Sequence, residues 1–464
     1  MDEGHLNTNL FLKQIEQSNL AVNSLILLQN GRTLVESYRK PYRKDTKQLL
    51  FSLSKSVTSI AVGIAWDNGY LSLDDQVISF FPDKLPESIS DHLAKMTVHH
   101  LLAMNAGHHH NIYSQVAEST DWVGTFLSLD VEHEPGSYYR YSTHSTYMLS
   151  AILERATGQK LVDFLMPRLF EPLSISRPTW ESCPTGITAG GMGLSLSTAD
   201  IARFGQMLLN KGEFAGHRVV SEAFLERAVS EQSDNRRDEN RIDFAQGYGY
   251  QFFLCRDGCF MGNGGFGQLC FVAPKQGIVI ATTSGMPSTK ELQLLLDLIY
   301  EHILKGEDED GFLVSGEGVL NPEIAGTNRI SQPIPESIPE LNDACYALDN
   351  NPLGIRRLKF ALRDKQLDLR LIYEDRERRL VFNFERLAYT QDTFIKDLAL
   401  HEQEAAICAS WLTNTILELT MVYFETPYIV TYTFTFENQR LLFQFHQNVS
   451  LGLKECSMIG QILN

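Results

Sequence analysis

The stretch "LLFSLSKSVTSIAVG" (residues 49–63) places a serine and a lysine three residues apart, Ser52 and Lys55, where a long apolar run begins. Such a run is typical of a buried helix. Residues three apart lie on the same helix face, with about 5–6 Å between their Cβ atoms, so a lysine amine can reach the serine hydroxyl. The first helical turn also offers N–H groups that favour developing negative charge. The stretch therefore raises the question of whether Ser52 is a nucleophile and Lys55 its base.

The Ser-x-x-Lys spacing is too short to be specific by itself. About one chance match is expected in a chain of this length, and Ser37–Lys40 ("SYRK") is a second match. Ser37 ends a strand-like run and leads into the basic residues 39–43, so it lacks the helical context. For Ser52 the alternative is an N-capping serine beside a solvated lysine. Whether Ser52 and Lys55 form a catalytic pair or only this capping arrangement depends on the rest of the chain.

Composition limits the classes of protein and partner. The chain has 464 residues, enough for two or three domains, and 43% hydrophobic against 21% charged residues, as in a globular protein. A net charge of −17 opposes binding to nucleic acid and to anionic membranes, so neither is expected as a partner. No apolar run is long enough to span a bilayer, and the first residues do not resemble a secretory signal.

The cysteines indicate a reducing compartment. They are odd in number and scattered, mostly in apolar strand-like segments: Cys183, Cys255, Cys259, Cys270, Cys345, Cys408 and Cys456. Free buried thiols are the expectation, and with them a cytoplasmic location. The pair Cys255 and Cys259 lacks a second Cys/His pair at zinc-ligand spacing.

The first part of the chain predicts an α/β (α+β) domain. A hairpin is expected around Asn30-Gly31, because this pair tolerates positive φ at both positions. A large helical region follows, in which Gly158 ends one helix and Ser197 and Asp200 form the capping box of another. From about residue 246, "QGYGYQFFLC", "CFMGNGGFGQLCFVAP" and "GIVIATTSG" read as antiparallel strands, followed by a helix in "TKELQLLLDLIYEHILKG". N- and C-terminal strands would complete one central antiparallel sheet around a helical insert.

Two boundaries are expected after this domain, which spans residues 1–305. Residues 306–340 are rich in glycine, proline and acidic residues and predict a linker. Residues 341–464 alternate strongly between apolar and polar positions and predict a separate all-β domain, a barrel or a sandwich.

Five segments, in order, resemble the serine β-lactamase and penicillin-binding-protein family, and in particular its class C and esterase-like branch. They are "FSLSKSVTSIAVGIAWDNGYLSLDDQVISFFP", "MTVHHLLAMNAG", "PGSYYRYSTHSTYMLSAILERATG", "GGMGLSLSTADIARFGQMLLNKGEFAGHRVVS", and "YGYQF" followed by "GNGGFGQ". Ser-x-x-Lys is the family's first motif. The resemblance covers roughly residues 22–304 and implies a β-lactamase/transpeptidase-like fold.

The resemblance also implies roles for particular residues. Ser52 would be the acylated nucleophile, Lys55 would accept or relay its proton, and Tyr141 would act as partner base or as acid for the leaving group. The backbone N–H groups of Ser52 and Phe266 would form the oxyanion hole, with Phe266 expected on the strand after Gly265. Which of Lys55 and Tyr141 is the base is left open.

Substrate binding is assigned by the same resemblance to Thr143, Asn263, Gly264 and Gly265, and two of these depart from the family pattern. Thr143 stands where the second motif usually has asparagine. Asn263 stands where the third motif usually has lysine or histidine, so a cation that would attract a substrate carboxylate is missing. Efficient hydrolysis of penicillin-like acids is therefore not expected.

No cofactor or metal is expected. The histidines that are candidate metal ligands are His99, His100 and His108–His110. They lack an acidic or cysteine ligand at regular spacing, so a surface or structural role is favoured over a metal site.

The sequence thus predicts a serine hydrolase that acts through an acyl-enzyme on a small ester, an amide or a peptide containing D-amino acids. The first alternative is a β-lactamase or D,D-carboxypeptidase. The second is a catalytically weakened binding or sensor module on the same fold. The expected partner is a small-molecule or short-peptide substrate, and a homo-oligomer is left open.

Overall fold

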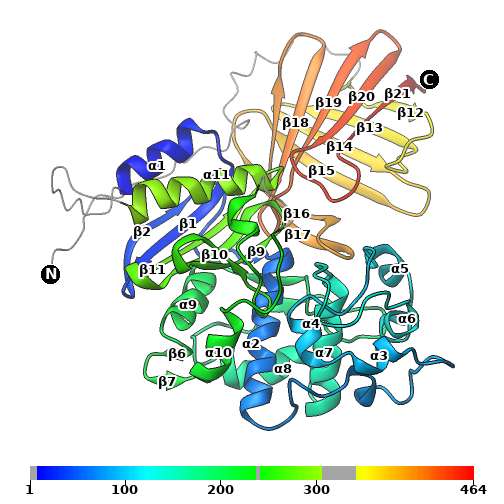
Figure 1. Cartoon of the computed structure of the whole chain (residues 1–464). Coiled ribbons are helices and arrows are strands. Elements are labelled where there is room, and N and C mark those ends of the chain that lie inside the picture. Colours follow the sequence, from blue (N-terminus) through cyan, green and yellow to red (C-terminus); the bar gives the residue numbers. More distant parts are fainter. Residues whose placement is uncertain (1–7, 237–240, 306–340, 464) are drawn as a thin grey trace. The chain divides into compact units, whose positions relative to one another are not determined.

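The protein is described here by a computed structural model that covers residues 8–236, 241–305 and 341–463. The chain divides into two compact units, coloured along the sequence in Figure 1. Unit 1 comprises Met1–Tyr38 and Lys47–Leu320, and unit 2 comprises Arg39–Thr46 and Asn321–Asn464. The predicted linker, residues 306–340, lies outside the described residues. Among the described residues, no helix has the length and apolarity that crossing a membrane requires.

Unit 1 contains a six-stranded antiparallel sheet in the order β2-β1-β11-β10-β9-β8. Its strands are β1 (Val22–Gln29), β2 (Arg32–Tyr38), β8 (Phe253–Leu254), β9 (Phe260–Gly264), β10 (Gln268–Ala273) and β11 (Ile278–Ser284). β1 pairs with β11, so strands from the two ends of the unit complete one sheet, as predicted. The β1–β2 turn has φ of 48° at Asn30 and 81° at Gly31, which confirms the predicted hairpin.

Helices cover both faces of this sheet. α1 (Thr8–Gln17) and α11 (Thr289–Ile299), which continues into η8 (Tyr300–Leu304), pack on one face through a large apolar cluster, and Figure 1 shows α1 and α11 side by side. α9 (Thr198–Leu209) packs on the other face. Its Gly205 lies so close to Val279 and Cys270 that an added Cβ would stand 2.5 Å from Val279. α9 begins with the predicted Ser197–Asp200 capping box.

The helical insert lies between β2 and β8. Its helices are η1 (Phe51–Leu53), α2 (Ser54–Asp67), η2 (Val77–Phe80), α3 (Asp91–Lys95), α4 (Val98–Leu102), α5 (Tyr113–Ala117), α6 (Trp122–Ser128), α7 (Thr143–Thr157), α8 (Leu161–Leu165), η3 (Met166–Phe170), α9, α10 (Glu222–Ala228) and η4 (Ile242–Phe244). Its short strands are β3 (Gln48–Leu49), β4 (Thr179–Trp180), β5 (Leu194–Leu196), β6 (Glu213–Phe214) and β7 (His217–Arg218). α7 ends at Gly158, whose φ is 70°, as predicted.

α2 is buried on every side, and its short polar side chains anchor the surrounding loops. All residues from Ser54 to Ala65 are buried. The hydroxyls donate to loop carbonyls: Ser56 to Gln251 (2.8 Å), Thr58 to Gly190 (2.8 Å) and Ser59 to Tyr250 (2.7 Å). A buried hydroxyl without a partner is costly, so these bonds fix the loops against the helix.

One strand prediction was wrong in detail. The stretch "CFMGNGGFGQLCFVAP" is not one strand but two, β9 and β10, joined by the tight turn η6 (Gly265–Gly267). Phe266 therefore lies in a turn, with φ of 65°, and not on a strand. Gly267, directly after Phe266, has φ of 89°, and a positive φ costs glycine little, which helps the chain to reverse here.

Unit 2 is a ten-stranded antiparallel sheet that curls into a nearly closed barrel, which confirms the predicted all-β domain. The strands are β12 (Ala344–Leu348), β13 (Arg357–Arg363), β14 (Gln366–Ile372), β15 (Glu377–Asn383), β16 (Ala388–Ile395), β17 (Leu400–Trp411), β18 (Ile416–Tyr423), β19 (Ile429–Glu437), β20 (Arg440–Gln447) and β21 (Glu455–Ile462). β15 and β16 are the two ends of the sheet order. They are joined by a buried ion pair between Arg378 and Asp392.

Candidate active site

Ser52 lies in a tight turn between a short strand and the buried helix. β3 leads through Leu50 into η1, which holds Ser52, and α2 follows directly. Phe51, just before Ser52, has φ of 48°, a left-handed conformation that costs a residue with a Cβ free energy. Ser52 remains half-buried, so its hydroxyl is not sealed in the core. The Nζ of Lys55 lies 2.9 Å from the Oγ of Ser52, at hydrogen-bond distance.

Lys55 is held by two further acceptors from distant parts of the chain. Its side chain is only 1% exposed. Nζ donates to the carbonyl oxygen of Gly191 at 2.7 Å and to Oγ1 of Thr143, the first residue of α7, at 3.3 Å. A Cβ at Gly191 would stand 2.6 Å from the Thr143 carbonyl oxygen, so only glycine lets this loop approach the lysine. The Thr143 hydroxyl contacts Lys55 at the position where the family usually has an asparagine amide.

Tyr141 brings a phenol to the same serine. The Nζ of Lys55 lies 5.0 Å from the centroid of the Tyr141 ring. Burial raises the pKa of Tyr141 to about 12, although the Ser52 side chain opposes the rise. The ring of Tyr141 stacks on Phe253 (6.0 Å between centroids) and meets Tyr248 edge-on (6.3 Å). These contacts hold the phenol in place, and the raised pKa keeps it protonated at neutral pH. Ser52, Lys55 and Tyr141 are therefore brought together, as the sequence predicted.

β9 runs directly against the turn that holds Ser52. A Cβ at Gly264 would lie 2.0 Å from the Leu50 carbonyl oxygen, and one at Gly262 would lie 2.4 Å from Ser56 Oγ. Gly265 faces the ring of Phe51, at 3.4 Å from its nearest atom. The Phe51 and Phe266 rings meet edge-on with centroids 5.2 Å apart. Glycines thus allow the predicted third-motif segment to approach the backbone around Ser52.

The side chain of Asn263 lies on the other face of β9. Side chains alternate along a strand, and those of Gly262 and Gly264 would point toward η1 and α2. Asn263 shares its face with Leu269, its partner on β10. Its Oδ1 is buried and makes no hydrogen bond within the described part of the chain. A role of Asn263 in substrate binding stays a prediction.

Gln251 is a structural residue of the site for which the sequence indicated no role. It is 2% exposed, and its φ is 64°. Its side chain accepts from the Thr146 hydroxyl of α7 at 2.6 Å and donates to the carbonyls of Leu101 (3.2 Å) and Leu102 (2.7 Å) of α4. Its own carbonyl accepts from Ser56 of α2. The side chain and backbone of Gln251 therefore join three helices around Ser52. The only sequence signal for this residue is its position in the "YGYQF" segment.

Two of the histidines, His99 and His108, occupy structural positions. His99 Nδ1 lies 2.7 Å from the Tyr250 hydroxyl, and His108 is buried against the ring of Phe126. Across residues 8–236, 241–305 and 341–463, no three His, Cys, Asp or Glu side chains gather in a way that could hold a metal ion. All seven cysteines are free, and Cys183, Cys255, Cys259 and Cys270 are buried.

The family follows from a comparison with known proteins. A family model described as Beta-lactamase matches residues 10–302, which is more than half of the 464 residues. The chain belongs to the beta-lactamase family. This confirms the resemblance inferred from the five segments, and it makes the protein a hydrolase related to the beta-lactamases.

Similar proteins include one named as a 6-aminohexanoate-dimer hydrolase and one named as an esterase. The chain is 26% identical over 287 residues to the 6-aminohexanoate-dimer hydrolase of Paenarthrobacter ureafaciens, covering 57% of this chain and 73% of that protein. It is 27% identical over 153 residues to the esterase EstB of Burkholderia gladioli, covering 29% of this chain and 39% of that protein.

A solved structure resembles the chain over nearly its whole length. The octameric penicillin-binding protein homologue from Pyrococcus abyssi has a TM-score of 0.51 at 16% identity, covering 99% of this chain and 100% of that one. At this identity the similarity concerns the fold.

Proposed function

We propose that the protein is a serine hydrolase that cleaves a small neutral ester, an amide or a peptide containing D-amino acids through an acyl-enzyme on Ser52. The observation that carries the proposal is the 2.9 Å contact between the Ser52 hydroxyl and the buried amine of Lys55. A serine becomes a useful nucleophile when an adjacent base accepts its proton as it attacks.

In the first step the Ser52 Oγ bonds to the substrate carbonyl carbon, and its proton passes to Lys55. In the amine form, Lys55 donates its two N–H groups to Gly191 and Thr143 and directs its lone pair at the serine proton. The carbonyl oxygen gains the negative charge, which the N–H groups of Ser52 and Phe266 would stabilise. Removing one such donor typically costs a few kcal/mol of transition-state stabilisation.

Tyr141 is suited to the next proton transfer. Its pKa of about 12 makes the phenol a poor resting base at neutral pH but a competent donor. As the bond from the carbonyl carbon to the leaving group breaks, the phenol protonates the leaving oxygen or nitrogen, and the proton on Lys55 restores the phenol. Water then attacks the carbonyl carbon of the ester on Ser52 and gives a proton to the same groups. As the bond from that carbon to the Ser52 Oγ breaks, these groups return a proton to Oγ and the acid leaves.

The substrate assignment rests on the third motif. Where the family usually has a lysine or histidine, this chain has Asn263, so a group that would attract a substrate carboxylate is missing at that place. This supports a neutral ester or amide over a penicillin-like acid. The activities for which the two relatives are named, hydrolysis of a 6-aminohexanoate dimer and of esters, are compatible with this class. A cytoplasmic location and a homo-oligomer stay predictions.

Labelling with a fluorophosphonate, read by intact mass, tests the proposal together with burst kinetics on a chromogenic short-chain ester. One adduct per chain and a burst are expected, and both should disappear in Ser52→Ala. Ser37→Ala is the matched control, because it removes the serine of the second Ser-x-x-Lys match and should keep both signals.

The alternatives predict different results in the same assays. Nitrocefin turnover comparable to ester turnover would favour a β-lactamase or D,D-carboxypeptidase. No adduct and no burst with ester, amide and lactam probes would favour a binding or sensor module that has lost turnover.

A further inference from the structure

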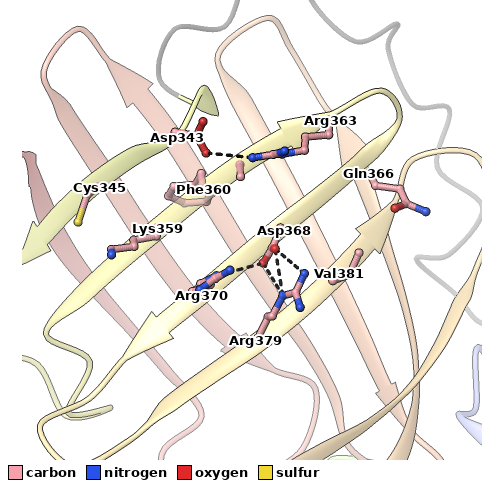
Figure 2. Close-up of a pocket in the computed structure, with 11 residues that line it drawn as sticks. Asp343, Cys345, Lys359, Phe360, Arg363, Gln366, Asp368, Arg370, Arg379 and Val381 are labelled. Atoms are coloured by element: carbon pink, nitrogen blue, oxygen red, sulfur yellow. Dashed lines mark hydrogen bonds and ion pairs between the residues drawn. The ribbon is translucent and has the colours of Figure 1, made fainter.

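A basic pocket lies on the outward face of the unit 2 barrel. It has a volume of about 680 Å³ and is formed by residues of β12 to β15 and the chain just before β12. Figure 2 shows Lys359, Arg363, Arg370 and Arg379 on this face, together with Asp343 and Asp368. The alternating burial of β13 and β14 explains the arrangement, since their apolar residues fill the barrel interior and leave the charged ones outside.

The cations are aligned across neighbouring strands. In the strand register, Lys359 of β13 is directly opposite Arg370 of β14, and Arg370 is directly opposite Arg379 of β15. Like charges in directly opposed positions destabilise a sheet. Three cations in one row therefore need anions beside them, and the chain supplies only some of these.

Acidic neighbours organise the row without neutralising it. Asp368 accepts from Nε and Nη2 of Arg379 and lies 3.7 Å from Nε of Arg370, which also contacts Glu377 at 3.3 Å. The side chain of Lys359 makes no ion pair and no hydrogen bond with another of the described residues. Arg370 and Arg379 are 44% and 58% exposed, so they are oriented yet open to solvent.

The surrounding sequence is basic in an acidic protein. Residues 356–386 hold ten lysines and arginines against six acidic residues, a net charge of +4, whereas the whole chain carries −17. The lining of the pocket itself holds four cations, Lys359, Arg363, Arg370 and Arg379, against the two carboxylates of Asp343 and Asp368. Such a locally positive surface attracts anions although the net charge of the chain repels them. The planar guanidinium groups match the paired oxygens of a phosphate or a carboxylate.

We propose that this pocket binds a small dianionic oxyanion ligand, either a phosphate monoester or a dicarboxylate. Lys359, Arg370 and Arg379 would contact its oxygens, with Asp368 holding Arg379 in orientation. The volume exceeds that of one phosphate group, so it leaves room for the organic part of the ligand. This site belongs to unit 2, and the proposal does not depend on the reaction proposed for Ser52.

Isothermal titration of the full chain tests the proposal, with phenyl phosphate and glutarate as probes at constant ionic strength. Saturable binding of at least one probe is expected, and the probe that binds identifies the ligand class. The double substitution Lys359→Gln/Arg370→Gln should weaken binding at least tenfold. Arg440→Gln/Lys454→Gln is the matched control, because it removes two exposed cations elsewhere on the barrel, and it should change affinity less than twofold.

Two results would overturn the proposal. One is the absence of saturable binding for both probes. The other is an equal loss of affinity in the two double variants, which would mean that the anion responds to overall charge and not to this pocket. Melting temperatures of both variants, measured in parallel, establish that the barrel remains folded.

Discussion

Substituting Gly264 by alanine should damage the site without touching any proposed catalytic side chain. The added Cβ would lie 2.0 Å from the Leu50 carbonyl oxygen and 3.1 Å from the Leu53 nitrogen, and contacts below 3.0 Å are essentially never seen. β9 and the turn around Ser52 must therefore separate by at least 1 Å. The φ of Gly264 is −128°, an ordinary extended value, so the effect of the substitution is steric.

The size of the effect follows from this displacement. Overpacking of a tight contact costs about 1–3 kcal/mol of unfolding free energy. A displacement of 1 Å between reacting groups can lower the rate by about 100-fold. Gly264→Ala should therefore reduce kcat/KM for a short-chain ester by about two orders of magnitude while the protein still folds.

Ester kinetics and urea unfolding of purified variants measure both quantities. Gly265→Ala is the control for stability, since the three atoms nearest to its Cβ would be side-chain atoms of Phe51, at 3.4 Å or more, which is ordinary van der Waals contact. It should leave the unfolding free energy within about 1 kcal/mol of the wild type. If Gly264→Ala kept wild-type kcat/KM and stability, the close approach of β9 to the Ser52 turn would be wrong.

Three further predictions concern the buried polar groups. Tyr141→Phe should lower the acylation rate by about 10²–10⁴-fold. The variant should also lose less unfolding free energy than the wild type between pH 10 and pH 12. In that range the unfolded wild type ionises Tyr141, whereas the folded wild type, in which the pKa of Tyr141 is about 12, keeps it protonated. His144, fully buried, has its pKa lowered to about 4 by burial and by the charge of Lys55. The wild type should therefore lose up to about 3 kcal/mol of unfolding free energy through His144 as the pH falls from 7 to 4, because only the unfolded state takes up the proton near pH 6.5. In His144→Phe the unfolding free energy, measured by urea titration at each pH, should depend less on pH. Arg378→Met should lower the unfolding free energy by about 3–5 kcal/mol, since it leaves the buried carboxylate of Asp392 without its cationic partner. Adding Asp392→Leu should restore most of this loss. A double variant no more stable than the single one would contradict this account.

The local elements of the fold could be predicted because their signals are local. The Asn30-Gly31 turn, the Ser197–Asp200 capping box and the glycine that ends α7 each depend on neighbouring residues and were found where expected. The alternation of apolar and polar residues was enough to predict an all-β second domain. The same alternation could not distinguish one long strand from β9 and β10, because Gly265 and Gly267 are compatible with both until the chain reverses at Phe266.

By itself, the sequence predicted that Ser52 and Lys55 lie close together where a buried helix begins, because they are three positions apart; Ser52 lies in the turn η1 and Lys55 in the first turn of α2. The family's order of motifs added Tyr141. Only the tertiary structure decided what holds the lysine: the carbonyl of Gly191 is 136 residues away along the chain, and Thr143 is 88 residues away. The same is true of Gln251, which joins α4 and α7, and of the ion pair that links β15 to β16. Local patterns depend on backbone geometry over a few residues, whereas these contacts depend on how whole elements pack, and no spacing in the sequence encodes that.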